Sequence, residues 1–550
     1  MPTHAMPKQR LSLAWSWGAA VIALPIAVPI LAILLAFVNP TGEVWQHLLD
    51  TVLWEYIGNT LLLLFLVAIL ATAMGVLPAW IVATREFPGR TIFAWALIIP
   101  IAAPAYVVAY AYADLLSFNG PVHASLTFLG FQNVSLPAIR SLSGAAFVLA
   151  ATLYPYIYLF AVNAFSQQAQ PLTEAARMLG ANSFTAFWRV AAPLARPAIV
   201  GGLALVLMET AADFGVVEFF GVPTLTNGIF RTWYAQGEQV AAMQLAGCLF
   251  VVVALLVVLE QLARRGLFAN PVSRNFASAR STGSTLANIG AIAICTLPIL
   301  LGFLLPGSLM LYHVITTGDP MLGRSFSDYL GNSITIGIIA ALCATACAIW
   351  LSYALRMQQR SAALRVSVRV ATLGYAIPGM VLAVGLIGPL TTLDKAIAET
   401  AERVFSANIG LVLTGSAAVL VFAYLARFMT VAFNSCEGGL AQIHPNYDAA
   451  ARSLGAGSAR LMRRIHLPLL TPSLLTAVLL VFVDVIKELP ATLILRPFNF
   501  ETLATRAYRL ASDERVAEAS TASLLIIVVG LVPAALIAWQ NFSRRGPTQH

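Results

Sequence analysis

Long apolar runs separated by short polar segments set the pattern of this chain. Twelve windows each hold the roughly 20 predominantly apolar residues that a helix needs to cross a bilayer. They are residues 13–38, 57–83, 91–116, 143–165, 194–216, 240–262, 286–315, 329–355, 368–392, 408–433, 469–492 and 519–541. The gaps between them are too short for a soluble catalytic domain. The pattern predicts an all-α polytopic membrane protein with about 12 transmembrane helices.

Composition supports this prediction. Hydrophobic residues make up 59% of the 550 residues and charged residues only 10%, whereas soluble domains carry about 25% charged residues. The formal net charge is +8, but no basic stretch is interleaved with aromatic residues as a nucleic-acid surface would be. The composition therefore excludes an ordinary soluble protein and gives no indication of a nucleic-acid partner.

The excess of positive charge has a topological interpretation. If the N-terminus is cytoplasmic, the twelve windows place 22 of the 32 Lys and Arg residues on the cytoplasmic side. Cytoplasmic loops of membrane proteins collect these residues. We therefore expect a multi-pass protein of the bacterial inner membrane with both termini in the cytoplasm.

A polar, basic segment near the middle of the chain separates two six-span halves. Residues 264–285 read RRGLFANPVSRNFASARSTGST and have the composition of a linker. We expect a first half over residues 1–263, this cytoplasmic linker, and a second half over residues 286–550.

The same short motif occurs in each half, at an offset of 275 residues. EAARMLG begins at Glu174, AAARSLG begins at Ala449, and a proline follows each glycine after twelve intervening residues. We expect a short amphipathic helix that turns at the glycine, then a second short helix that ends at the proline opening the next span. The alternative is a basic loop that lies on anionic lipid. The motif residues are Glu174, Ala175, Ala176, Gly180 and Pro193 in the first copy and Ala449, Ala450, Ala451, Gly455 and Pro468 in the second.

These two segments resemble the EAA loops of ABC importer permeases. The resemblance implies a type I permease fold of two parallel six-helix repeats, with coupling loops at 174–197 and 449–472. It also implies that each loop docks in a groove of a separate ATP-binding subunit. The first copy has Ala192 where a leucine usually precedes the proline, and the second has Ala449 in place of the glutamate, with Asp448 one residue earlier.

A further resemblance narrows the family. METAADFGVVEFFGVPTLTNGIFRTW, which ends at Trp233, and VFVDVIKELPATLILRPFNFETLATRAY, which ends at Tyr508, look like segments of fused ferric-iron permeases. Thiamine and phosphonate permeases are neighbours of that group. The resemblance implies import of ferric iron, with thiamine, another small cation or a phosphonate as the alternative.

Acidic residues lie inside two of the apolar windows. At the same offset of 275, Glu209 matches Asp484 and Asp213 matches Glu488. A continuous helix would put each i, i+4 pair on one face, and Lys487 lies beside the last acid. Ionisable groups in a membrane cost about 2.5–3.5 kcal/mol each on insertion scales and should face protein or water. They are candidates for a cation pathway, for gate or docking contacts, or for structural capping and ion pairing.

No ATP-hydrolysing motif is present. None of the lysines Lys8, Lys395 and Lys487 follows a glycine, so no Walker A loop can be written. No catalytic constellation, cofactor motif or firm metal site stands out. We expect a transport subunit that works by alternating access with two copies of an ATPase subunit and an external substrate-binding protein. The rival hypothesis is an ion-coupled secondary transporter, which gives no reason for the paired loops.

Overall fold

The computed structural model describes residues 13–38, 42–118, 120–131, 136–166, 175, 176, 178–264, 281, 282, 284–320, 326–358, 361–406, 410 and 412–544. Their helices form two compact units. The first is drawn from Met1–Leu35, Asn332–Ile486 and Leu495–Phe500, and the second from Ala36–Gly331, Lys487–Ile494 and Glu501–His550. Each unit therefore contains segments from both halves of the sequence. The division into a first half, 1–263, and a second half, 286–550, stays a prediction based on the sequence repeat.

The first unit is built on long apolar helices. Trp15 of α1 packs on Trp350 of α16, with ring centroids 4.4 Å apart, and α19 packs along α22. Gly385 of α18 lies so close to α1 that a Cβ there would come 2.8 Å from the carbonyl oxygen of Pro29. The elements are α1 (Leu13–Ala36), α16 (Phe326–Met357), α17 (Ala362–Ala371), η5 (Gly374–Ala376), α18 (Gly379–Phe405), α19 (Ala417–Gln442), α20 (Pro445–Ser453), α21 (Ser458–Leu461), η6 (Met462–His466) and α22 (Leu467–Ile486).

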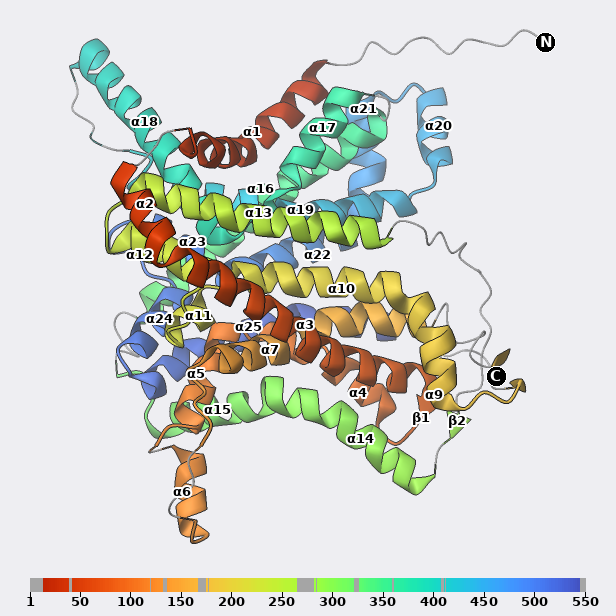
Figure 1. Cartoon of the computed structure of the whole chain (residues 1–550). Helices are drawn as coiled ribbons and strands as arrows, with labels where there is room; N and C mark the ends of the chain where they lie inside the picture. Colours follow the sequence, from red (N-terminus) through yellow and green to blue (C-terminus); the bar gives the residue numbers. More distant parts are fainter. Residues whose placement is uncertain are drawn as a thin grey trace. The chain divides into compact units, whose positions relative to one another are not determined.

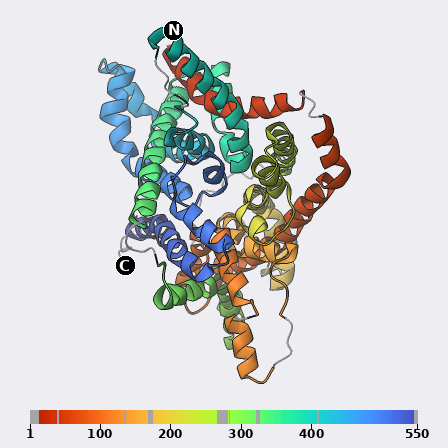
Figure 2. The ribbon, with the colours of Figure 1, turned by 90° about the vertical axis from the view of Figure 1, so that its left-hand side faces the viewer.

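The second unit is centred on α3, α7 and α10, which pack on one another side by side (Figure 1). Its elements up to α12 are α2 (Gly42–Thr51), α3 (Leu53–Thr84), β1 (Arg85–Glu86), α4 (Arg90–Ala96), η1 (Ile99–Ala102), α5 (Ala105–Leu115), α6 (Pro121–Phe128), α7 (Leu142–Ala164), α9 (Ser183–Ala186), η3 (Phe187–Ala191), α10 (Ala192–Ala212), α11 (Gly215–Phe219) and α12 (Leu225–Tyr234). The remaining elements are α13 (Gln239–Arg264), β2 (Ser281–Thr282), α14 (Thr285–Ile299), η4 (Leu300–Leu304), α15 (Leu305–Thr316), α23 (Pro490–Leu495), α24 (Leu503–Ser512) and α25 (Val516–Arg544). The two short strands pair in parallel, and α6 extends beyond the end of α5 (Figure 2).

The apolar helices agree with the predicted membrane protein. Within the described residues, nine helices are long and apolar enough to cross a bilayer, or up to 11 if each of two bent pairs is one span. The last predicted window, 519–541, overlaps the shorter apolar segment Val516–Val532, which is the first part of α25. An all-α polytopic membrane protein is confirmed, whereas the count of 12 spans stays a prediction.

Several predicted spans are not single straight helices. In the window 91–116, the helical segments Arg90–Ala102 and Ala105–Leu115 meet at 92°, because Pro104 has an extended ψ of 138° and proline cannot donate to the preceding turn. The window 368–392 was also predicted wrongly as one helix. There α17 ends at Ala371, and α18 begins only after Pro378, whose ψ is 139°.

A buried ion pair holds α24 in the second unit. Arg506 donates three hydrogen bonds to Asp319, from Nη2 to Oδ1 (3.0 Å) and Oδ2 (3.1 Å) and from Nε to Oδ2 (3.3 Å). The side chains of Arg506 and Asp319 are 4% and 0% exposed. We expect Asp319→Asn to lower the free energy of unfolding by about 3–5 kcal/mol, because it leaves a buried charge without its counter-ion. Thermal unfolding in detergent measures the effect. As a control, Arg403→Ala breaks the exposed pair with Glu399 and should cost less than about 1 kcal/mol. An equal loss in both variants would contradict the prediction.

Candidate functional site

The second motif copy forms a short helix with a defined beginning and end. His444 precedes α20, and its Nδ1 accepts a hydrogen bond from the backbone N–H of Asn446 (3.2 Å). At the other end, Gly455 adopts a φ of 79°, and the N–H of Ala456 donates to the carbonyl oxygen of Ala451 (3.0 Å). This is the glycine C-cap that the sequence predicts, in which the positive φ favours glycine.

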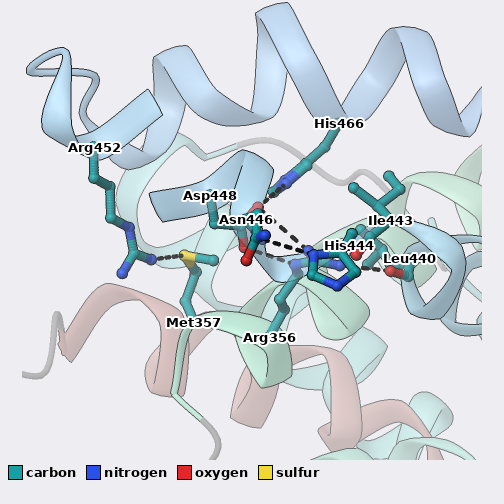
Figure 3. Close-up of polar contacts among 9 residues, drawn as sticks. All are labelled: Arg356, Met357, Leu440, Ile443, His444, Asn446, Asp448, Arg452 and His466. Carbon is teal, nitrogen blue, oxygen red and sulfur yellow. Dashed lines mark hydrogen bonds and ion pairs between the residues drawn. The ribbon is translucent and has the colours of Figure 1, made fainter. Parts of the chain in front are cut away.

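Asp448, near the start of α20, connects three elements of the first unit (Figure 3). Its carboxylate accepts hydrogen bonds from Nε (2.9 Å) and Nη2 (3.3 Å) of Arg356, at the end of α16. It also interacts with Nε2 of His466, in η6, at 2.8 Å. The guanidinium of Arg356 donates further to the carbonyl oxygens of Leu440 and Ile443, just before α20. This triad of Arg356, Asp448 and His466 fixes α20 against the helices on both sides of it.

The triad is shielded from solvent. The side chain of Asp448 is 15% exposed, that of Arg356 14% and that of His466 0%. Burial alone would raise the pKa of Asp448, but the hydrogen bonds from Arg356 and His466 outweigh it, so this pKa lies below its usual value. The carboxylate is therefore ionised at neutral pH, and the ion pair is intact there.

The opposite face of α20 is exposed and partly apolar. Ala451 is buried, whereas Ala449 and Ala450 are exposed. Tyr447 is 56% exposed, and Leu454, at the turn, is 85% exposed. A helix fixed by one face and presenting alanines and larger apolar side chains on the other has the form of a docking element.

Both motif copies continue into their spans through a π-helical turn. η3 and η6 begin at Phe187 and Met462, again 275 residues apart. In each turn, the first residue of the following helix donates its backbone N–H to the carbonyl oxygen of the first residue of the turn. Pro193 and Pro468 lie one residue into α10 and α22. The prediction that the second short helix ends at these prolines is therefore wrong. The wider π turn accommodates a residue that has no N–H, so the helix continues.

The first motif copy has the same turn but a different anchor. Gly180 has a φ of 90°, Ala175 lies in the helix before it, and Leu179 is 89% exposed. Glu174 lies outside the described residues. The π turn is held by aromatic packing, because the ring of Phe187 lies 5.2 Å from Trp80 and 6.1 Å from Phe165, centroid to centroid.

Two of the four membrane acids lie at helix breaks. α10 ends at Ala212, and α22 ends at Ile486. Glu209 and Asp484 are thus within helices, whereas Asp213 and Glu488 lie beyond their ends. The prediction that each pair shares one helix face is wrong, because the i, i+4 spacing applies only to a continuous helix.

Asp213 and Glu488 each cap the short helix that follows. Oδ1 of Asp213 accepts from the backbone N–H groups of Val216 (3.0 Å) and Val217 (3.4 Å) at α11. Oε1 of Glu488 accepts from the N–H of Ala491 (3.0 Å) at α23, and the side chain is buried. Capping satisfies backbone donors that the break would otherwise leave unpaired. Lys487 lies between α22 and α23 and is half-buried.

Arg356 and His466 were not among the predicted site residues. Both are separated from Asp448 by intervening elements, so no local spacing connects them. The one available signal was the position of Asp448 itself. It directly precedes Ala449, the residue that aligns with Glu174 of the first copy.

Comparison with known proteins gives one family over most of the chain. Residues 9–265 and 333–545 match the family described as binding-protein-dependent transport system inner membrane component. The Fe(3+)-transport system permease protein FbpB 2 of Haemophilus influenzae is 25% identical over 527 residues, covering 94% of this chain and 96% of the relative. The ferric transport system permease protein FbpB of Actinobacillus pleuropneumoniae is 23% identical, covering 86% and 69%. The sulfate transport system permease protein CysT of Escherichia coli is 30% identical over 177 residues, covering 30% and 61%.

Proposed function

Because this chain belongs to the family of binding-protein-dependent transport system inner membrane components, we propose that it is the permease of an ATP-driven importer of ferric iron. The observation that supports ferric iron as the substrate is the match along nearly the full length of a Fe(3+)-transport permease. It covers 94% of this chain and 96% of the relative. The match to a sulfate permease covers only 30% of the chain.

The two motif loops are the docking sites for two copies of an ATPase subunit. Each loop turns at a glycine with positive φ and exposes a leucine at that turn, Leu179 in one and Leu454 in the other. Each is also continuous with a long apolar helix, α10 or α22. Movement of the ATPase subunits on ATP binding is thus transmitted along these helices to the breaks at Asp213 and Glu488, and this movement drives alternating access.

The orientation follows from the same assignment. Loops that bind a cytoplasmic ATPase are cytoplasmic, which agrees with the positive-inside distribution of Lys and Arg. Both chain termini are then cytoplasmic, and the helix breaks lie toward the outside, where a substrate-binding protein delivers its cargo.

A transport assay tests the proposal. In a strain that lacks the chromosomal permease gene, expression of this chain with its ATPase and binding protein should restore uptake of radiolabelled ferric iron, but not of thiamine or sulfate. Co-purification of the ATPase is the second readout. Uptake of thiamine or sulfate in preference to iron would refute the substrate. Uptake without any associated ATPase would favour an ion-coupled transporter instead.

A further inference from the structure

Two buried tyrosines lie next to the helix breaks of the second unit. Tyr106 and Tyr110 are one turn apart on α5, so they share a face, and they are 5% and 0% exposed. Neither hydroxyl has a hydrogen-bond partner in the described part of the chain. A buried hydroxyl without a partner is destabilising. Two of them on one face therefore require an explanation.

Both tyrosines pack against α11, the short helix that Asp213 caps. The ring centroid of Tyr110 lies 4.6 Å from that of Phe219. A Cβ on Gly215 would come 2.5 Å from Cβ of Tyr106 and 3.3 Å from Cδ2 of Leu489, the residue after Glu488. The bend before α5 and the breaks before α11 and α23 therefore meet at one place.

The acidic residues that cap these breaks belong to the same segments. Asp213 lies two residues before Gly215 and caps α11, and Glu488 lies directly before Leu489 and caps α23. Each acid is partly engaged in capping a backbone end. The place where the three breaks meet thus brings two buried tyrosines and two acidic residues onto adjoining segments.

We propose that Tyr106 and Tyr110, with Asp213 and Glu488, form a transit site for ferric iron, a site that rests on the function proposed above. Fe³⁺ is a hard cation, and carboxylate oxygens suit hard cations, while tyrosine is an established ligand of iron in proteins. Each phenol that binds loses its proton to water, and the resulting phenolate ligates the ion without a change of oxidation state. In this site the passing ion is the partner that the two hydroxyls lack among the described residues.

Tyrosine-to-phenylalanine substitutions test this site with little disturbance of packing. The test pair is Tyr106→Phe with Tyr110→Phe, and the control is Tyr154→Phe. Tyr154, on α7, is equally buried, and its hydroxyl also lacks a hydrogen-bond partner within the described ranges.

We expect the double variant, in the complete complex with its ATPase and binding protein, to import ferric iron about tenfold or more slowly than the unsubstituted protein. Its ATP hydrolysis stimulated by the binding protein should stay within about twofold, as should both activities of Tyr154→Phe, because loss of an unpaired hydroxyl is nearly neutral. A direct readout is titration of the permease–ATPase complex with ferric citrate in the absence of binding protein. The unsubstituted complex should develop visible phenolate-to-iron charge-transfer absorption, and the double variant should not.

The outcomes separate the transit site from the proposed function. Iron uptake and absorption unchanged in the double variant would overturn the transit site and leave the importer intact. Equal losses in the double variant and in Tyr154→Phe would also overturn it, because the effect would then be one of packing. An unsubstituted complex that assembles with its ATPase but imports no iron would overturn the proposed substrate, and the transit site with it.

Discussion

Substitution of both turn glycines by valine, Gly180→Val with Gly455→Val, is expected to reduce uptake about 100-fold. Their φ angles are 90° and 79°, and a side chain forced into such a conformation costs on the order of 1–3 kcal/mol. About 1.4 kcal/mol corresponds to a factor of ten in a binding constant. Each loop is expected to lose about tenfold in affinity for the ATPase subunit, and the two losses multiply to about 100-fold. Uptake and co-purification of the ATPase measure it.

Among the described residues, nothing lies within 4 Å of a Cβ built on either glycine. The expected effect of the valines is therefore on backbone conformation and on the shape of the turn. Gly438→Val is the matched control, because this exposed glycine lies within α19, has no positive φ and also has open space around it. Full uptake by the double variant with no ATPase bound would contradict the importer and favour an ion-coupled transporter.

Hydropathy was sufficient to predict the membrane helices but not their bends. An apolar window scores equally for a straight span and for two helical segments at 92°, as between α4 and α5. Pro104 was a visible signal, because the residue before a proline is disfavoured in the α conformation. The sequence also predicts the turns at Gly180 and Gly455 correctly, since a glycine after the last helical residue has a local, short-range cause.

The sequence pattern did not predict the tertiary contacts. The triad around Asp448 depends on which helix ends come together, and nothing in the spacing of Arg356 or His466 indicates it. The i, i+4 interpretation of the membrane acids failed for a related reason, because it assumed that helices continue through Asp213 and Glu488. The two carboxylates instead satisfy backbone donors at the breaks.

The two motif loops are anchored by different chemistry. At the offset of 275, the triad positions Arg356, Asp448 and His466 correspond to Ile81, Thr173 and Ala191. Ile81, Thr173 and Ala191 carry no charge and so cannot form the same ion pairs, and aromatic contacts of Phe187 hold the π turn of the first loop.

Asp448→Asn is therefore expected to weaken docking at the second loop alone. The substitution leaves Arg356 largely buried without its counter-ion, and breaking a buried pair costs about 3–5 kcal/mol. We expect uptake to fall at least about tenfold, since 1.4 kcal/mol corresponds to a factor of ten, while one ATPase copy remains bound. Asp50→Asn, which removes an exposed carboxylate, should leave uptake unchanged. Loss of both ATPase copies, or normal uptake, would contradict a role confined to α20.

The pH dependence of stability gives an independent check on the same carboxylate. The folded-state pKa of Asp448 is lowered, so its contribution to stability is complete above the unfolded pKa of about 3.9. That contribution is lost as pH falls through the lower, folded-state pKa. The melting temperature in detergent should therefore decrease between about pH 5 and pH 2 more steeply for the unsubstituted protein than for Asp448→Asn. Parallel curves would mean that the ion pair with Arg356 contributes nothing to stability and that another contact holds α20 in place.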